Sequence, residues 1–270
     1  MGGAGAYRAP MDHIAVQGEE VPALGFGTWQ LTGDDAREGT RHALELGYRQ
    51  IDTAQAYRNE REVGEGIAQS GVPREEIFLT TKIVGESLAG DKVGPAVDAS
   101  LRRLGTDYVD LLLIHWPTDQ VPLGETLSAM RAAKDAGKVR HLGVSNFRGP
   151  LLLEAMELAP ILADQVPYQP GRTQNTLLGI AVERDVMLTA YSPLRGDGVQ
   201  SRVLVEIGGS HGKTPYQVAL RWLLQQDKVS PIPRSSNPDR RAQNADIFDF
   251  ELSEDEMARI SAVRAGEGSR

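Results

Sequence analysis

The chain has 270 residues, with 29 Lys and Arg against 37 Asp and Glu, a formal net charge of −8 and no cysteine. The absence of cysteine excludes a disulfide framework, a Cys-ligated zinc site, an iron–sulfur cluster and a thiol nucleophile. The negative charge disfavours nonspecific binding to nucleic acid or to an anionic membrane. With 40% hydrophobic and 24% charged residues, the composition is that of a globular protein with a core to bury.

The N-terminal residues and the apolar runs contain no targeting or membrane signal. Residues 1–10 are rich in Gly and Ala and lack the apolar stretch of a secretory signal, so they are expected to form a flexible leader. The longest apolar run, residues 109–114, is interrupted by Asp110 and is far shorter than the ~20 residues of a membrane-spanning helix. We therefore expect a cytoplasmic protein, a monomer, whose partner is a small molecule.

Short apolar runs alternate with longer segments of helical period along the chain. The runs are residues 23–28, 49–53, 77–82, 109–115, 139–145, 162–166, 187–191 and 229–233. Eight strands that alternate with helices predict a parallel sheet closed into a (β/α)8 TIM barrel. Residues 14–21, with Gly18 at the turn, predict an extra N-terminal β-hairpin. No stretch has the composition of a linker, so residues 1–270 are predicted to be one barrel domain.

Several helix starts carry capping signals. They are Asp34, Asn59 with Glu62, Thr214 with Pro215, and Ser253 with Glu256. A short polar side chain at these positions accepts a hydrogen bond from the first turn of a helix, and proline fits the first helical position. The last of them predicts an extra C-terminal helix outside the barrel.

In a barrel of this kind the functional groups gather where the strands end. The strand ends here carry Trp29, Asp52, Lys82, His115, Ser145 with Asn146, Gln165, Tyr191 and Arg234. Asp52 and Lys82 end adjacent predicted strands. Because an unpaired charge is rarely accepted inside a barrel, these two side chains are expected to pair.

Four motifs in this order resemble the signatures of the aldo-keto reductase superfamily. They are residues 25–29 (GFGTW), 51–57 (IDTAQAY) followed by Asn59 and Glu60, 111–117 (LLLIHWP) and 143–147 (GVSNF). The match runs from about residue 14 to residue 263, and the chain resembles short-loop bacterial members such as the 2,5-diketo-D-gluconate reductases. The resemblance implies reversible reduction of aldehydes and ketones, with a catalytic tetrad at Asp52, Tyr57, Lys82 and His115.

The chemistry of carbonyl reduction asks for these residue types. A tyrosine with an ordinary pKa of ~10 is a poor acid unless its anion is stabilised. A nearby Lys ammonium supplies that stabilisation, and Asp52 would keep Lys82 charged and in place. His115 can orient the carbonyl or share the proton. Taken singly, each residue has a structural explanation, such as an ion pair at strand ends or a buried histidine.

The cofactor implied by the resemblance is NADPH or NADP⁺, with NADH as a weaker alternative. No glycine-rich dinucleotide fingerprint of the Rossmann type and no Walker motif occurs. By resemblance, Ser145, Asn146 and Gln165 bind the nicotinamide carboxamide, Tyr191 stacks on its ring, and residues 191–194 follow the pyrophosphate. The full expected cofactor set is Gly27, Thr28, Asp52, Ser145, Asn146, Gln165, Tyr191, Ser192, Leu194, Arg234, Ser235, Ser236, Asn237, Arg240, Gln243 and Asn244.

The chain departs from the family pattern at a few positions. Arg234 stands where the family usually has Lys, and Gln243 where it often has Glu. Arg keeps the charge that suits a 2′-phosphate but changes the geometry. Arg241 is expected on a solvated helix face. The expected substrate contacts are Trp29, Tyr57, His115 and Trp116. Val84 replaces a frequent Trp, which predicts an open pocket with broad specificity for small carbonyl compounds.

Three rival interpretations remain open at this stage. A barrel lyase would use Lys82 as a Schiff base, which needs a neutral lysine and conflicts with Asp52 beside it. A non-enzymatic subunit could bind NADPH for regulation. A metal hydrolase is disfavoured because the five His have no paired ligand spacing, so no metal is expected. The substrate itself and the direction of the reaction do not follow from the sequence.

Overall fold

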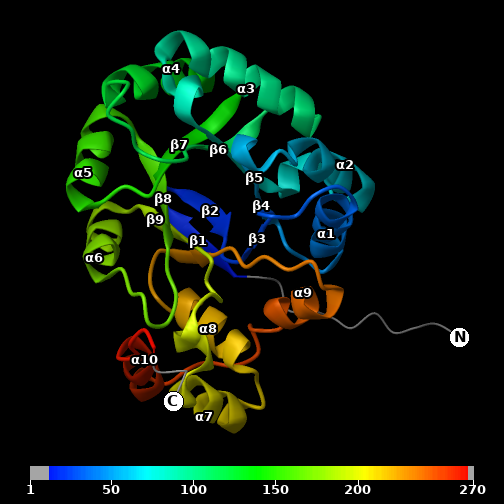
Figure 1. Cartoon of the computed structure of the whole chain (residues 1–270), viewed down its shortest axis with the longest axis vertical. Helices are drawn as coiled ribbons and strands as arrows, with labels where there is room; N and C mark the ends of the chain where they lie inside the picture. The colour runs from blue at the N-terminus through cyan, green and yellow to red at the C-terminus, as the bar shows by residue number, and fades with distance from the viewer. Residues whose placement is uncertain (1–11, 267–270) are drawn as a thin grey trace, which may run out of the picture.

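The computed structural model describes residues 12–266, and the expected leader at residues 1–10 lies outside them. Eight parallel strands form one sheet in which each strand lies beside its neighbour in the chain (Figure 1). They are β3 (Gly25–Gly27), β4 (Gln50–Asp52), β5 (Phe78–Ile83), β6 (Val109–Ile114), β7 (Val139–Ser145), β8 (Ile161–Pro167), β9 (Met187–Tyr191) and β10 (Val229–Pro231). The predicted (β/α)8 barrel and its eight strand positions are confirmed.

Helices surround this sheet (Figure 1). They are α1 (Asp34–Glu45), α2 (Glu60–Ser70), α3 (Gly90–Leu104), α4 (Leu123–Asp135), α5 (Gly149–Leu158), α6 (Asn175–Arg184), α7 (Arg202–His211), α8 (Pro215–Leu224), α9 (Pro238–Ala245) and α10 (Glu254–Ser261). Short 3-10 turns occur at η1 (Gln55–Tyr57), η2 (Arg74–Glu76), η3 (Gly85–Leu88) and η4 (Asp197–Gln200). The predicted extra C-terminal helix is α10, which packs beside α7. No helix in residues 12–266 is long and apolar enough to cross a membrane.

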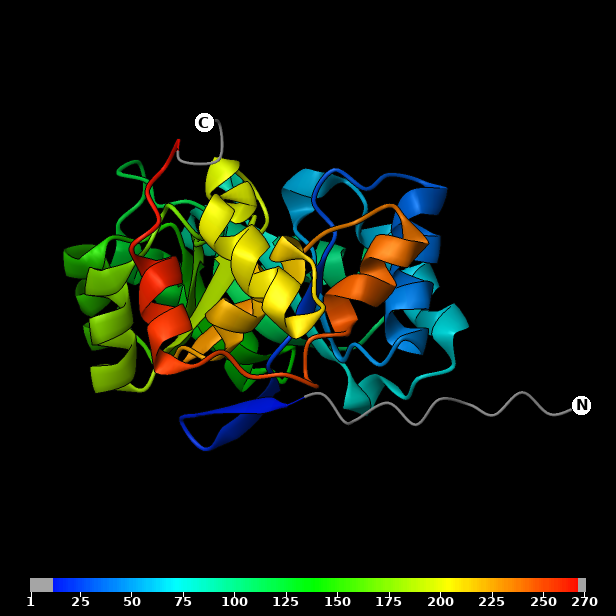
Figure 2. The ribbon, with the colours of Figure 1, turned by 90° about the horizontal axis from the view of Figure 1, so that it is seen from below.

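The predicted N-terminal hairpin covers one end of the barrel (Figure 2). β1 (His13–Val16) and β2 (Glu19–Pro22) pair antiparallel, and their turn contains Gly18 at φ 81°, a backbone conformation that glycine adopts without strain. Val16 and Val21 are buried in a cluster with residues of β6, β8 and β9, among them Met187 at the start of its strand. The hairpin therefore closes the end at which the strands begin and leaves the other end for a site.

The barrel closes between β3 and β10 at a narrow seam. The Gly27 amide donates to the carbonyl of Pro233 at 3.1 Å. A Cβ on Gly25 would lie 2.7 Å from Ile232 Cγ2, and one on Gly27 would lie 2.8 Å from the Ile232 carbonyl oxygen. No larger residue fits either position, so both glycines of this motif serve the close approach of the first and last strands.

Two of the predicted helix caps form and two do not. Thr214 and Ser253 each make a complete capping box. α1 begins after Gly33 without a side-chain cap, and Asp34, the predicted cap, instead pairs with Arg37. A carboxylate one residue inside the helix still interacts favourably with the helix dipole. The missing side-chain cap at the start of α1 therefore costs the fold little stability.

Asn59 stands at the start of α2, but the predicted box with Glu62 is wrong. Its Nδ2 donates to the carbonyls of Thr28 and Leu31, both at 2.9 Å, and its Oδ1 accepts from Thr53 at 2.8 Å. Asn59 is fully buried, so these longer-range partners satisfy its amide in place of the helix end. The residue thus fastens the loop after β3 to the loop after β4.

Candidate active site

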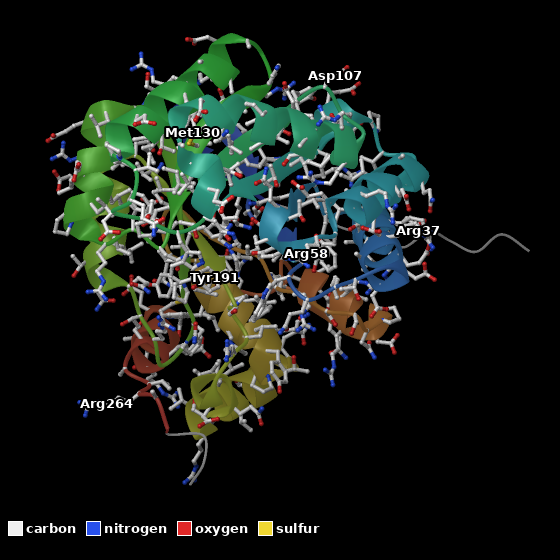
Figure 3. The ribbon with its side chains drawn as sticks, turned by 45° about the horizontal axis from the view of Figure 1, so that its top comes forward. Arg37, Arg58, Asp107, Met130, Tyr191 and Arg264 are labelled. Carbon is white, nitrogen blue, oxygen red and sulfur yellow. The ribbon has the colours of Figure 1, made fainter. Side chains whose placement is uncertain are left out.

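The carboxyl ends of the strands surround a cavity of about 770 Å³. It is lined by Gly27, Trp29, Gln30, Asp52, Ala56, Tyr57, His115, Trp116, Ser145, Gln165, Tyr191, Ser192, Pro193, Leu194, Arg195, Ile232, Pro233 and Arg234. Figure 3 shows Tyr191 toward the middle of the ring of helices. A volume of this size lies within the range of small-molecule and cofactor sites.

Lys82 lies just behind this cavity and is completely buried. Its Nζ donates to Asp52 Oδ1 at 2.6 Å, to the Thr53 carbonyl at 2.9 Å and to Tyr57 Oη at 3.3 Å. β4 and β5 are parallel neighbours, so the two charged strand ends meet, as the sequence predicted. Three acceptors take up the three donors of the ammonium, which is the condition for burying such a group at tolerable cost.

Burial and neighbouring charges act in opposite directions on the pKa values of Lys82 and Tyr57. Burial alone lowers the pKa of Lys82, but Asp52 and Tyr57 outweigh it and raise that pKa above its ordinary value. Burial raises the pKa of Tyr57, while the charge of Lys82 opposes the rise. At neutral pH, therefore, Lys82 is charged and Tyr57 keeps its proton. The ammonium favours the phenolate, as predicted, although burial has the larger effect.

Asp52 also connects this cluster to the opposite side of the barrel. Its Oδ2 accepts a hydrogen bond from Gln165 Nε2 of β8 at 2.7 Å, and Ser145 Oγ of β7 donates to the Gln165 carbonyl at 2.8 Å. Thr28, which lies behind the cavity, donates its hydroxyl to the Asp52 carbonyl at 2.9 Å. The side chains expected to bind the nicotinamide therefore share one hydrogen-bond network with the predicted tetrad.

His115 completes the predicted tetrad at the end of β6. Its ring packs edge-on against Tyr57, with ring centroids 5.6 Å apart. Burial, and secondarily the charge of Lys82, lowers the pKa of His115 to about 4. The imidazole is consequently neutral at physiological pH and can serve as a neutral hydrogen-bond donor. Its Nδ1 has no hydrogen-bond partner among the residues that the structure describes.

Strained backbone surrounds the cavity. Seven non-glycine residues among residues 12–266 have φ between 49° and 64°, a region that costs about 1–3 kcal/mol for a side chain. Four of them, Gln30, Arg58, Asn146 and Ser192, line the cavity or lie next to residues that line it. Such strain persists where surrounding contacts enforce it, and it concentrates at functional sites.

At Asn146 the contacts that hold the strained backbone are visible. Its Nδ2 donates to the His115 carbonyl at 3.0 Å and to Ser145 Oγ at 2.9 Å. Its Oδ1 accepts from Tyr191 Oη at 2.9 Å. The side chain therefore ties the ends of β6, β7 and β9 together.

The residues expected at the adenosine end form a separate group beyond the cavity. Arg234 lines the cavity rim and donates to Gln30 Oε1 at 2.6 Å across the seam. Ser235, Ser236 and Asn237 follow in the loop before α9, and Arg240, Gln243 and Asn244 lie on α9 itself. The Asn237 side chain caps α9 by accepting from the Arg240 amide at 3.0 Å.

The expectation for Arg241 is wrong. This residue is 6% exposed and does not lie on a solvated face, because its guanidinium turns inward beneath the loop that carries Ser235 and Ser236. Sequence reasoning also missed Gln30, Ala56 and Arg195 at the cavity. Gln30 and Arg195 each directly follow a predicted site segment, and this adjacency was the only available signal.

Comparison with known proteins agrees with this geometry. The Aldo/keto reductase family model matches residues 23–265. The chain belongs to this family. The predicted family and fold are thereby confirmed, and the chain is an oxidoreductase of the aldo-keto reductase type.

Several aldo-keto reductases resemble this one along nearly its whole length. It is 41% identical over 254 residues to the glyoxal reductase of Bacillus subtilis, covering 93% of this chain and 91% of the relative. A crystal structure described as 2,5-diketo-D-gluconic acid reductase B matches with a TM-score of 0.92 and 44% identity, covering 96% and 93% of the two chains. The aldo-keto reductase of Bombyx mori, solved in complex with NADP, matches with a TM-score of 0.88 and 32% identity, covering 97% and 95%.

Proposed function

We propose that this aldo-keto reductase uses NADPH to reduce small aldehydes and ketones, and that Tyr57 delivers the proton. The observation that carries the proposal is the phenol of Tyr57, which faces the cavity and accepts a hydrogen bond from a buried, charged Lys82 at 3.3 Å. A protonated phenol whose anion would be stabilised on the spot is the donor that carbonyl reduction needs. NADH is the weaker alternative cofactor.

The residues around the cavity suit a nicotinamide dinucleotide. Ser145, Asn146 and Gln165 offer amide and hydroxyl groups for the carboxamide, and Tyr191 offers an aromatic face beside them. Ser192 and Leu194 border the path toward the Arg234 rim, where cationic side chains suit phosphate groups. When bound, the reduced nicotinamide supplies the hydride for the carbonyl carbon.

The protein's own groups handle the proton. Tyr57 donates its Oη proton to the carbonyl oxygen, and the phenolate left behind is stabilised by Lys82, which Asp52 holds in place at 2.6 Å. The phenol then regains a proton from solvent. Neutral His115, edge-on to Tyr57, donates a hydrogen bond to the same carbonyl oxygen and so aligns it.

The walls of the cavity support a broad range of small carbonyl substrates. Trp29 and Trp116 are 43% and 56% exposed, so the aromatic groups at the cavity mouth leave it open to solvent. Aromatic aldehydes fit these flat apolar surfaces, and compact α-dicarbonyls need little enclosure. The glyoxal reductase of Bacillus subtilis is a relative whose name agrees with the second class.

The first test is loss of absorbance at 340 nm when purified protein, NADPH and a panel of aldehydes and ketones are mixed. We expect Tyr57→Phe to lose at least ~100-fold in turnover and to bind NADPH as the parent does, because other groups hold the nicotinamide. Tyr216→Phe is the matched control, since its hydroxyl lies at the surface and accepts a hydrogen bond from Gln200 at 3.0 Å. It should leave turnover unchanged.

The outcomes separate the proposal from its rivals. If no carbonyl compound consumed NADPH or NADH, while NADPH still bound, the chain would be a binding subunit. Near-normal turnover of Tyr57→Phe would move the proton donor elsewhere, with His115 the next candidate. Covalent trapping of Lys82 by borohydride with a keto substrate would favour the lyase, although the raised pKa of Lys82 opposes a neutral amine.

A further inference from the structure

Arg241 is a buried cation in the middle of α9, on the side that faces α1. Its guanidinium lies against Gly39 of α1, where an added Cβ would be 3.7 Å from Arg241 Nη1, an ordinary contact distance. The Tyr48 hydroxyl donates to the Arg241 carbonyl at 3.3 Å. Residues outside α9 therefore surround Arg241. The sequence of α9 alone does not show them, and it predicts a solvent-exposed position.

The guanidinium holds the loop before α9 from beneath. Nη1 donates to the carbonyls of Ser235 and Ser236, both at 3.0 Å, and Nε donates to His42 Nδ1 at 3.1 Å. Two carbonyls of consecutive residues are thus fixed by one planar group. Arg234 and Ser236 of this loop are exposed, whereas Ser235 is buried.

Arg241 lacks a carboxylate in direct contact. Among residues 12–266 no Asp or Glu oxygen lies within 4.0 Å of its guanidinium, whereas the similarly buried Arg221 has Glu251 at 3.6 Å. Burial lowers the pKa of Arg241, and only longer-range effects of Tyr48 and Asp35 oppose this. A buried charge without a counter-ion is costly, and an anion bound on the loop above would offset that cost.

We propose that Arg241 is the positioning and specificity-determining residue for the cofactor phosphate. It fixes the loop of residues 234–237 and places a positive charge under it, so that a dinucleotide with a 2′-phosphate binds better than one without. This inference rests on the proposed function. It adds to the surface cations Arg234 and Arg240 a third cation that does not itself touch the phosphate.

The test uses two variants and a matched control. Arg241→Leu removes both the charge and the hydrogen bonds, whereas Arg241→Lys keeps the charge but cannot span both carbonyls. Arg221→Leu removes a buried arginine of α8, 7% exposed, whose side chain contacts Gln225 and Glu251. Fluorescence titrations give Kd for NADPH and NADH, and calorimetry gives Kd for adenosine 2′,5′-bisphosphate and for 5′-AMP as probes of the adenosine end.

We expect Arg241→Leu to raise Kd for NADPH and for the 2′,5′-bisphosphate about tenfold. Kd for NADH and 5′-AMP should stay within about twofold, and kcat at saturating NADPH should stay within about twofold, because Arg241 is remote from the reacting atoms. Arg241→Lys should raise Kd for NADPH roughly threefold, because the lysine keeps the positive charge but loses the paired hydrogen bonds to the loop. Arg221→Leu should lower stability without changing the NADPH to NADH ratio.

An equal loss for NADPH and NADH in either Arg241 variant, or no loss in either, would overturn the inference and leave Arg241 a structural residue. If Arg241→Leu did not fold, the Lys variant would decide by the same comparison. A change in the NADPH to NADH ratio in Arg221→Leu would also overturn it. A parent protein that bound neither cofactor would refute the proposed function, and this inference with it.

Discussion

Removing one member of the buried Asp52–Lys82 pair should cost far more stability than removing both. Lys82 is fully buried, and among residues 12–266 its carboxylate contact is Asp52 Oδ1 at 2.6 Å. Asp52→Asn leaves the ammonium without a counter-charge, and breaking a buried pair in this way costs about 3–5 kcal/mol. Lys82→Met leaves Asp52 with Gln165 as its remaining side-chain donor and should also be destabilising.

The double variant, Asp52→Asn with Lys82→Met, has no buried charge at these two positions. Replacement of a buried ion pair by uncharged groups is often close to neutral, so the double variant should be more stable than Asp52→Asn alone. We expect a coupling free energy of about 2–3 kcal/mol from the double-mutant cycle, measured by urea unfolding at pH 7. Turnover should be lost in all three variants, because none keeps a charged Lys82 beside Tyr57.

Additive losses in the cycle, with the double variant as unstable as the two single variants combined, would refute the reasoning. That result would mean that the two side chains stabilise the barrel independently of each other. A double variant with turnover near that of the parent would refute the catalytic part, since the phenolate would then need no ammonium. The unfolding slope of each variant serves as the control, because a changed slope would signal a change in the unfolded or native state rather than in stability alone.

The remaining predictions concern one buried acid and one surface cation. Asp164 of β8 is fully buried, and neither of its carboxyl oxygens has a hydrogen-bond partner of ordinary geometry among the described residues. Burial raises its pKa well above the ordinary value, and the nearby Phe147 amide opposes only part of that rise. Its favourable contribution is present below pH 3.8 and is lost as pH rises through the raised pKa. Asp164→Asn should therefore stabilise the protein by on the order of 1 kcal/mol at pH 8 but not at pH 3, and equal urea midpoints of variant and parent at pH 8 would contradict this. Arg240→Ala should raise Kd for NADPH roughly ten- to a hundredfold and leave NADH unchanged in fluorescence titrations, and equal losses for both would remove Arg240 from the phosphate site.

The barrel and the Lys82 cluster were predictable because both depend on local patterns. Apolar runs of strand length alternate with helical segments, and a polar, charged or aromatic residue stands at or near the end of each run. Because neighbouring strands of the barrel are also neighbours in the chain, their order in the sequence shows which strand ends meet. Asp52 and Lys82 could be paired because adjacent parallel strands place their ends side by side.

Arg241 and Asn59 were misinterpreted because some of their hydrogen-bond partners lie far away in the sequence. An arginine in a polar helix normally faces solvent, and nothing in α9 reveals that His42, about 200 residues earlier, accepts a hydrogen bond from it at 3.1 Å. Asn59 has the right chemistry for a cap, but the carbonyls of Thr28 and Leu31 compete for its amide. A residue's local preference does not predict its structure where distant residues form hydrogen bonds with the same side-chain group.

The seam between β3 and β10 couples the closure of the ring to ligand binding, because residues from both sides line the cavity. The cavity is lined on one side of the seam by Gly27 and Gln30, and on the other by Ile232 and Arg234. A ligand that touches both sides binds only the closed ring, and at a hundred times Kd it stabilises that state by about 2.7 kcal/mol. The two strands come from opposite ends of the sequence, so the concentration of the dinucleotide would govern how often the first and last strands separate. Protease resistance and amide exchange of these strands would then depend on the concentration of dinucleotide as well as on the stability of the fold.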